Sequence, residues 1–317
     1  MKRFLAKHSP LVILAVLCLL IAALMPNFRK PGNLKKVAYR TPVFGIMASG
    51  QTLVILTGGI DLSVGSVAAL SGVVNAKTIK AMESRSLPAS VSVGIAAGLA
   101  VATLCGVLCG FATAYGKIPA FISSLGMMMI ARGAALVITG GVPVRGFPDR
   151  FAYLGGTRGW YIPVSFMLFI VALLTILLLA TRFGRAVYAI GGNSQSARLS
   201  GIPVHRDRMW VFVLCALLAG FAGIVETSRV DIAAPTAAEG YELEAVAACV
   251  IGGASLMGGE GTVIGALAGT LIMQILVNLC NLLHIETDWQ KILVGSLVIA
   301  LVAYDTYRKR KSGLLKE

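Results

Sequence analysis

The sequence predicts an all-α, polytopic membrane protein with about ten transmembrane segments, some of them broken or re-entrant. Hydrophobic residues make up 57% of the 317 residues, charged residues only 13%, and the mean hydropathy is +0.83. Apolar runs such as 11–25, 164–180 and 292–303 approach, with flanking apolar residues, the ~20 residues that span a bilayer as a helix. The polar connections are too short for a soluble second domain, so residues 1–317 are predicted to form a single transmembrane domain.

The apolar segments set the expected topology. In order they are 10–26, 41–57, 60–76, 90–116, 119–140, 162–180, 209–228, 241–258, 262–283 and 289–305. An even number of spans puts both termini on one side, and the basic residues at both ends make that side cytoplasmic by the positive-inside rule. The first segment lacks a small-x-small cleavage site, so it is expected to remain as an uncleaved span. The basic loop 27–40 conflicts with the positive-inside rule, because the count of spans places this loop outside.

A break after residue 56 is the feature around which the chain is organised. Gly58 and Gly59 weaken a helix there, and an ionised Asp61 in hydrocarbon would cost several kcal/mol. Such a break is tolerated where backbone is buried in protein, lines a water-filled path or lies at a membrane surface. Asp61 or Ser63 can cap the following helix. Both a tight turn between two spans and a gate on a transport path fit these residues, and Gly65 belongs to the same candidate gate.

A weak repeat and a charged residue extend the candidate path. Residues 250–259 echo 56–65 with the same spacing of Gly-Gly, Leu and Gly, which suggests a parallel duplication around a shared pathway, with chance similarity as the alternative. Gly252 and Gly253 thereby join the candidate path. Arg132 lies mid-way through 119–140, where a guanidinium must face the bundle interior or an aqueous cavity, and a carboxylate such as Asp61 or Glu226 is its expected partner.

Two polar segments are candidates for contact with partners. Residues 194–199 are predicted to form a short helix, capped by Asn193 or Ser194 and ended at Gly201-Ile202-Pro203. A short helix between glycine hinges suits docking onto another protein, whereas a basic connector on lipid headgroups is the alternative. The candidate residues of this loop are Gly191, Gly192, Asn193, Ala197, Arg198 and Gly201. At the other face, Tyr241, Glu242 and Glu244 open a span, where they could cap its positive end or receive an outside partner.

Several function classes are disfavoured. The net charge of +14 lies in loops between apolar runs, so topology and anionic headgroups explain it better than nucleic acid does. The sequence has no GxxxxGK[ST] phosphate loop, since Gly116-Lys117 is followed by Ile118-Pro119. The cysteines lie in apolar runs without ligand spacing, and no metal site or catalytic constellation is visible, so the chain is not expected to be an enzyme. Any energy for transport must come from a partner or an ion gradient.

Four long stretches together resemble the permease subunits of bacterial ABC importers for ribose and related monosaccharides. They read LTGGIDLSVGS, GKIPAFISSLGMM followed by ARG, FGRAVYAIGGNSQSARLSGI, and GYELEAVAACVIGGASLMGGEGTVIGAL. The likeness runs in one order from about Thr41 to the C-terminus. Cys249 and Met257 in the second Gly-Gly segment and the basic loop 27–40 depart from the pattern, which blurs which sugar is carried.

This resemblance implies a homodimer in the bacterial inner membrane, two cytoplasmic ATPase subunits that bind the ATP, and a periplasmic sugar-binding protein. It implies that Asn193 to Gly201 couples to the ATPase and that the Gly58–Ser63 turn shapes an inner gate. This chain is then expected to hold no cofactor of its own. An ion-coupled secondary sugar transporter, with Asp61, Glu226 or Arg132 in an ion relay, is the alternative.

Overall fold

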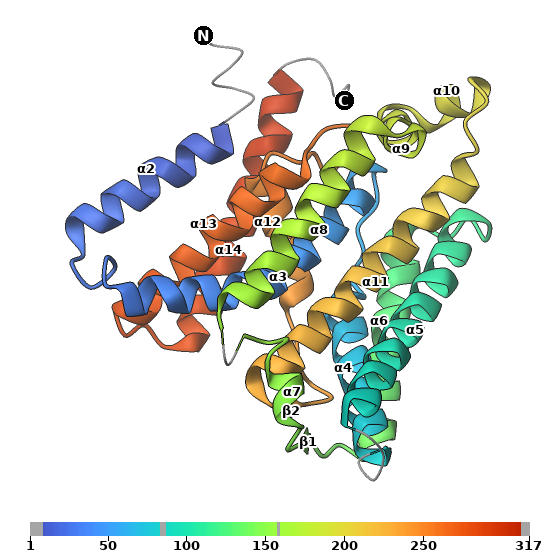
Figure 1. Cartoon of the computed structure of the whole chain (residues 1–317). Coiled ribbons are helices and arrows are strands. Elements are labelled where there is room, and N and C mark those ends of the chain that lie inside the picture. Colours follow the sequence, from blue (N-terminus) through green and yellow to red (C-terminus); the bar gives the residue numbers. More distant parts are fainter. Residues whose placement is uncertain (1–8, 83–86, 157–158, 312–317) are drawn as a thin grey trace.

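The computed structural model describes residues 9–82, 87–156 and 159–311 (Figure 1). In these ranges there are thirteen α-helices and two short strands. The elements are α2 (Ser9–Leu24), α3 (Pro31–Leu56), α4 (Val64–Ala81), α5 (Leu87–Ala114), α6 (Ala120–Thr139), β1 (Val144–Arg145), α7 (Asp149–Ala152), α8 (Tyr161–Ala180), α9 (Arg182–Gly192), α10 (Ser194–Leu199), α11 (Val204–Val230), β2 (Ile232–Ala233), α12 (Tyr241–Ile251), α13 (Val263–Leu282) and α14 (Thr287–Lys311).

The predicted helical membrane fold is confirmed. Each of the ten predicted apolar segments coincides with one helix, in order α2 to α6, α8, and α11 to α14. Five of them, α5, α6, α8, α11 and α13, are by themselves long and apolar enough to cross a membrane. Figure 1 shows α9 and α10 at one end of the bundle, together with the start of α2 and the last turns of α14, and β1, β2 and α7 at the other. These are called the α10 end and the β1–β2 end below.

The centre of the bundle is built from small residues. A Cβ on Gly223 of α11 would overlap the Ala68 carbonyl oxygen of α4, and a Cβ on Gly72 would overlap Thr227 Oγ1. Ala68 and Gly72 are one helical turn apart, as are Gly223 and Thr227, so both helices present a small-xxx-small face. In lipid, helices associate by van der Waals packing, and small residues let the two backbones come into contact.

The β1–β2 end is closed by an antiparallel strand pair. Val144 pairs with Ala233 and Arg145 with Ile232, so the connections after α6 and after α11 are held side by side. Phe151 of α7 is buried, and Gly155 N donates to Ser228 Oγ at 2.7 Å. These contacts fix where the chain turns after α11.

Two boundaries differ from the prediction. α3 begins at Pro31, so its first turns absorb most of the basic stretch expected as a loop, because proline favours the first helical position and Leu, Lys and Arg are good helix formers. That stretch lies at the end opposite α10, as the span count requires: Asn33 Nδ2 donates to Asn278 Oδ1 near the end of α13 at 2.9 Å. α12 ends at Ile251 instead of continuing to residue 258, because Gly252 and Gly253 terminate it.

Candidate functional site

The turn between α3 and α4 (residues 57–63) is the first part of the candidate site. Gly58 has φ +76°, a left-handed conformation that favours glycine, and it reverses the chain after α3. Asp61 is 1% exposed, and its Oδ1 accepts hydrogen bonds from Ser63 N at 2.8 Å and from Ser63 Oγ at 2.6 Å. Ser63 occupies the N-cap position of α4 without a side-chain cap bond, and its hydroxyl donates to Asp61.

Three glycine-containing turns meet at the α10 end. Gly259 N donates to Leu56 O at 2.9 Å. A Cβ on Gly191, in the last turn of α9, would overlap both Leu56 O and Gly259 N, and a Cβ on Gly258 would lie 2.8 Å from Gly58 N and 2.9 Å from Gly191 O. The turn after α3, the end of α9 and the turn after α12 therefore touch backbone to backbone. We call this contact of Gly58, Gly191, Gly258 and Gly259 the glycine junction.

The two repeated Gly-Gly segments lie against each other at this junction. The shared pathway around them stays a prediction. The role of Gly191 in the glycine junction was not foreseen, although a third Gly-Gly pair at 191–192 was visible in the sequence. Tyr188 of α9 strengthens the contact, because its hydroxyl donates to Gly261 O at 2.8 Å. Burial raises the pKa of that hydroxyl, so it keeps its proton and remains a donor.

The remaining gate candidates lie in close packing contacts. Gly59 faces Ala120 at the start of α6, and Gly252 lies against the backbone of Gly265 in α13. Gly253 has φ +85° and ends α12. Gly65 in the first turn of α4 faces Ala238 O and Glu242 Oε2. Gly59 and Gly65 therefore lie at opposite ends of the same turn and link it to two different parts of the bundle.

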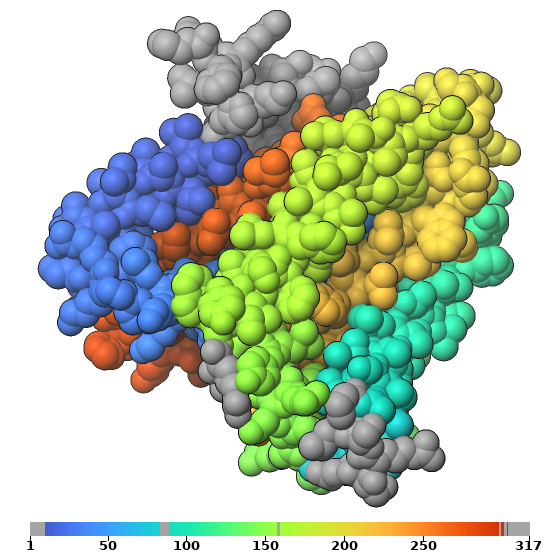
Figure 2. Space-filling model, in the orientation of Figure 1, coloured from blue at the N-terminus to red at the C-terminus, as the bar shows by residue number. Residues whose placement is uncertain are grey.

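The short helix α10 forms as predicted, whereas the helix α9 before it was not foreseen. Asn193 caps α10 by accepting from Ser196 N at 2.9 Å, and Gly201, with φ +81°, ends it. Ala197 is buried against Ile190 and Val204, while Arg198 is exposed. Leu199, next to it, is 84% exposed. A Cβ on Gly192 would meet nothing within 4 Å. The result is a short rigid helix that presents a basic and an apolar side chain on the surface, and Figure 2 shows it, in yellow, at the upper right.

The expected ion pair of Arg132 with Asp61 or Glu226 is wrong. Arg132 Nη1 instead donates to the carbonyl oxygens of Pro235 and Ala237 at 2.7 and 2.8 Å. Those carbonyls belong to non-helical backbone that returns from β2 into the bundle, and such backbone needs donors at this depth. The sequence could not show this, because the acceptors are main-chain atoms of a segment that looked like an outer loop.

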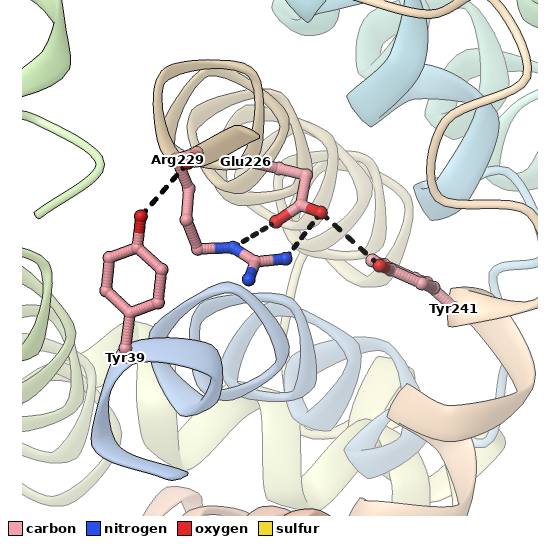
Figure 3. A network of polar contacts seen from close by, with 4 residues as sticks. All are labelled: Tyr39, Glu226, Arg229 and Tyr241. Atoms are coloured by element: carbon pink, nitrogen blue, oxygen red, sulfur yellow. Dashed lines mark hydrogen bonds and ion pairs between the residues drawn. The ribbon is translucent and has the colours of Figure 1, made fainter. Parts of the chain in front are cut away.

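Glu226 is held by another arginine (Figure 3). Arg229 Nε donates to Glu226 Oε2 at 2.8 Å and Arg229 Nη2 to Oε1 at 2.7 Å, a bidentate pair within α11. Tyr39 of α3 donates to Arg229 O at 3.0 Å, and Tyr241 of α12 donates to Glu226 Oε1 at 3.4 Å. The network ties α3, α11 and α12 together, which is a structural use of Glu226.

The three residues predicted to receive an outside partner open α12 as expected, but their side chains are half-buried. Tyr241 packs on Phe44 with ring centroids 4.4 Å apart. Glu242 Oε1 accepts from Gly240 N at 3.3 Å. Glu242 Oε2 is buried and accepts no hydrogen bond from the described residues. Glu244 lies near enough to Arg40 for a favourable electrostatic interaction.

A cavity at the β1–β2 end was not foreseen. It has a volume of about 830 Å³ and lies between the start of α3 and the ends of α11 and α13. Its lining is cationic and rich in amides: Asn27, Lys30, Gly32, Asn33, Lys36, Val37, Tyr39, Arg40, Arg229, Gln274, Asn278, Asn281, Leu282 and His284. Arg229 is neutralised by Glu226. Arg40 is partly balanced by Glu244. Lys30 and Lys36 leave the cavity positive, which favours an anionic group. The basic stretch 27–40 was the sequence signal that could have indicated this cavity.

Comparison with known proteins gives a consistent result. Residues 33–302 match the family described as "Branched-chain amino acid transport system / permease component". The chain is 41% identical over 314 residues to the ribose import permease protein RbsC of Escherichia coli K12, covering 97% of this chain and 96% of that protein. It is 40% identical over 303 residues to RbsC of Bacillus subtilis (94% and 92%). It is also 38% identical over 307 residues to the L-arabinose transport system permease protein AraH of E. coli K12 (96% and 92%). No solved structure matches the chain significantly.

Proposed function

This chain belongs to the family of transport-system permease components, and from that premise we propose that it is the membrane permease of an ATP-driven importer for ribose or a related monosaccharide. The observation that carries the proposal is the 41% identity to a ribose import permease over 97% of the chain. The similarity extends from the first helix to the last, so it includes both the candidate gate segments and α10. We place both termini and α10 on the cytoplasmic side of the bacterial inner membrane, and we regard the chain as one transmembrane domain.

The proposed assembly holds two copies of this chain. Within the chain, α14 packs mainly on α12. Its apolar side chains Ile292, Leu293 and Ile299 are each at least half exposed. α6 exposes Met129, Ile130 and Val137 in the same way. A second copy against these helices would bury these faces and enclose a path between the two copies.

The proposal is tested by purification of the chain from its native membrane. We expect an ATP-hydrolysing subunit to co-purify, and ATP turnover to rise when a ribose- or arabinose-loaded binding protein is added. A lone chain that moves either sugar down an ion gradient without ATP would instead show a secondary transporter, and Asp61 and Arg132 would be the first residues to replace.

α10 is the proposed ATPase contact, with the ATP bound by the partner subunit. Arg198→Glu or Leu199→Asp should abolish co-purification of the ATPase, because arginine is enriched among interface hot spots, each worth about 2 kcal/mol or more, and an aspartate at position 199 would bury an unpaired charge in the interface. The measurement is the ATPase-to-permease ratio after affinity purification. Leu283→Asp makes the same change at the β1–β2 end, where Leu283 is 52% exposed, and should leave the ratio unchanged. A normal ratio for Arg198→Glu and Leu199→Asp would refute the assignment.

The cationic cavity at the β1–β2 end is the proposed docking point for acidic side chains of the sugar-binding protein. Lys30→Glu combined with Lys36→Glu should weaken binding of that protein about tenfold at low salt, mainly through a slower association rate, and less in high salt. Surface plasmon resonance on the solubilised permease measures both rates. Lys291→Glu, a charge reversal outside the cavity, is the control. Equal association rates for the double variant and the wild type would refute docking at this cavity.

A further inference from the structure

Residues 234–240, the re-entrant segment, lie deep in the bundle. The segment follows β2 at the β1–β2 end and leads into α12. A Cβ on Gly65 would overlap Ala238 O and Glu242 Oε2. Gly65 is in the first turn of α4, and a helix rises roughly 24 Å between Gly65 and Ala81, its last residue at the β1–β2 end. Ala238 and Glu242 are therefore well inside the membrane-spanning part of the molecule.

One side of the re-entrant segment is packed and the other is open. Pro235 and Ala238 are buried, whereas Thr236 and Glu239 are exposed. Non-helical backbone at this depth is tolerated only within protein or along a water-filled cavity. Arg132 satisfies two of its carbonyl oxygens on the packed side. An exposed carboxylate such as that of Glu239 cannot face hydrocarbon without a large cost, so the open side must face water.

Two carboxylates lie here, that of Glu239 on the segment and that of Glu242 in the first turn of α12. Glu239 and Glu242 both lie close enough to Arg132 to interact with it electrostatically, so part of their charge is balanced. Glu242 Oε2 accepts no hydrogen bond from the described residues, but it is buried against Gly65. The side chain of Glu242 as a whole is half-buried and that of Glu239 is exposed. A monosaccharide is an uncharged molecule with several hydroxyl donors, and O–H···O⁻ bonds to a carboxylate are among the strongest neutral-to-ionic contacts.

We propose that the re-entrant segment and the first turn of α12 form the sugar-contact site of the transport path, where Glu239 and Glu242 accept hydrogen bonds from sugar hydroxyls. Arg132 is a positioning residue, because it holds the backbone of the segment and touches main-chain oxygens. This assignment rests on the proposed function of the chain and goes beyond it by naming where the sugar passes.

The first test is transport by the complete importer in proteoliposomes, with labelled D-ribose and L-arabinose as probes. Glu239→Gln and Glu242→Gln should each lower the sugar carried per ATP hydrolysed by about tenfold, the factor for loss of one charge-assisted hydrogen bond. Arg132→Lys should lower it as well, because one ammonium cannot hold both carbonyls in the same geometry. Glu286→Gln makes the same acid-to-amide change in the exposed loop before α14 and should match the wild type.

The second test measures whether position 239 is accessible to water. Its result does not depend on transport activity. Glu239→Cys in the full complex should react with a water-soluble thiol reagent and be protected by sugar-loaded binding protein. Phe169→Cys is the matched control, because Phe169 is 67% exposed in the middle of α8 and should face lipid, where the reagent does not react.

The outcomes are distinct. An unreactive Glu239→Cys, or wild-type coupling in both glutamine variants, would overturn the sugar-contact site while leaving the importer intact. A wild-type complex that carries neither of these sugars nor another monosaccharide would overturn the proposed function, and the sugar-contact site with it.

Discussion

Gly191→Ala is expected to abolish the coupling of ATP hydrolysis to sugar movement. A methyl group at this position would overlap the Leu56 carbonyl oxygen and the Gly259 nitrogen, which are backbone atoms that no rotamer change can move away. The turns after α3 and α12 would have to separate from α9, and the hydrogen bond from Gly259 to Leu56 would be lost. Since α9 leads directly into α10, a movement of α10, the proposed ATPase contact, would no longer be transmitted to the turns after α3 and α12.

The measurement compares sugar uptake with ATP hydrolysis in the reconstituted importer. We expect stimulation of the ATPase by sugar-loaded binding protein to fall to the unstimulated level, with uptake at least about tenfold lower, as for a disruption of 1–3 kcal/mol by overpacking. Gly192→Ala is the matched control, because nothing lies within 4 Å of a Cβ at that position. Normal stimulation in Gly191→Ala would show that the glycine junction does not transmit movement.

Gly223→Ala is expected to give a large loss of thermal stability. Its Cβ would meet the Ala68 carbonyl oxygen, so α11 and α4 could no longer touch at the centre of the bundle. Overpacking of this kind costs about 1–3 kcal/mol, and here the clash is with backbone. Unfolding temperature in detergent, followed by the loss of monodisperse protein on heating, measures the effect.

Gly133→Ala is the control for this variant. Gly133 lies inside α6, and nothing lies within 4 Å of a Cβ there. Alanine is favoured over glycine in a helix by roughly 0.5–1 kcal/mol, so this variant should unfold at the same temperature as the wild type or higher. If Gly223→Ala unfolds no earlier than Gly133→Ala, the close approach of α4 and α11 is not what stabilises the bundle.

The sequence by itself determined the helical segments and the local ends of helices. The ten apolar segments coincide with ten helices, because burial in lipid requires a run of apolar residues that is visible without any partner. The short helix α10 was also predicted correctly, from the cap at Asn193 to the end at Gly201, since both depend on residues within one turn.

Only the tertiary structure decided which groups meet. Arg132 was expected to pair with Asp61 or Glu226. Its hydrogen-bond partners are the carbonyls of Pro235 and Ala237, far along the chain. The carboxylates that interact with it are those of Glu239 and Glu242. Leu56, Gly191 and Gly259 come from three separate segments, and nothing in any one of them specifies the others. The physical reason is that a pattern of residues fixes the conformation of its own segment, whereas pairing between segments depends on how whole helices pack, which small residues permit but do not encode.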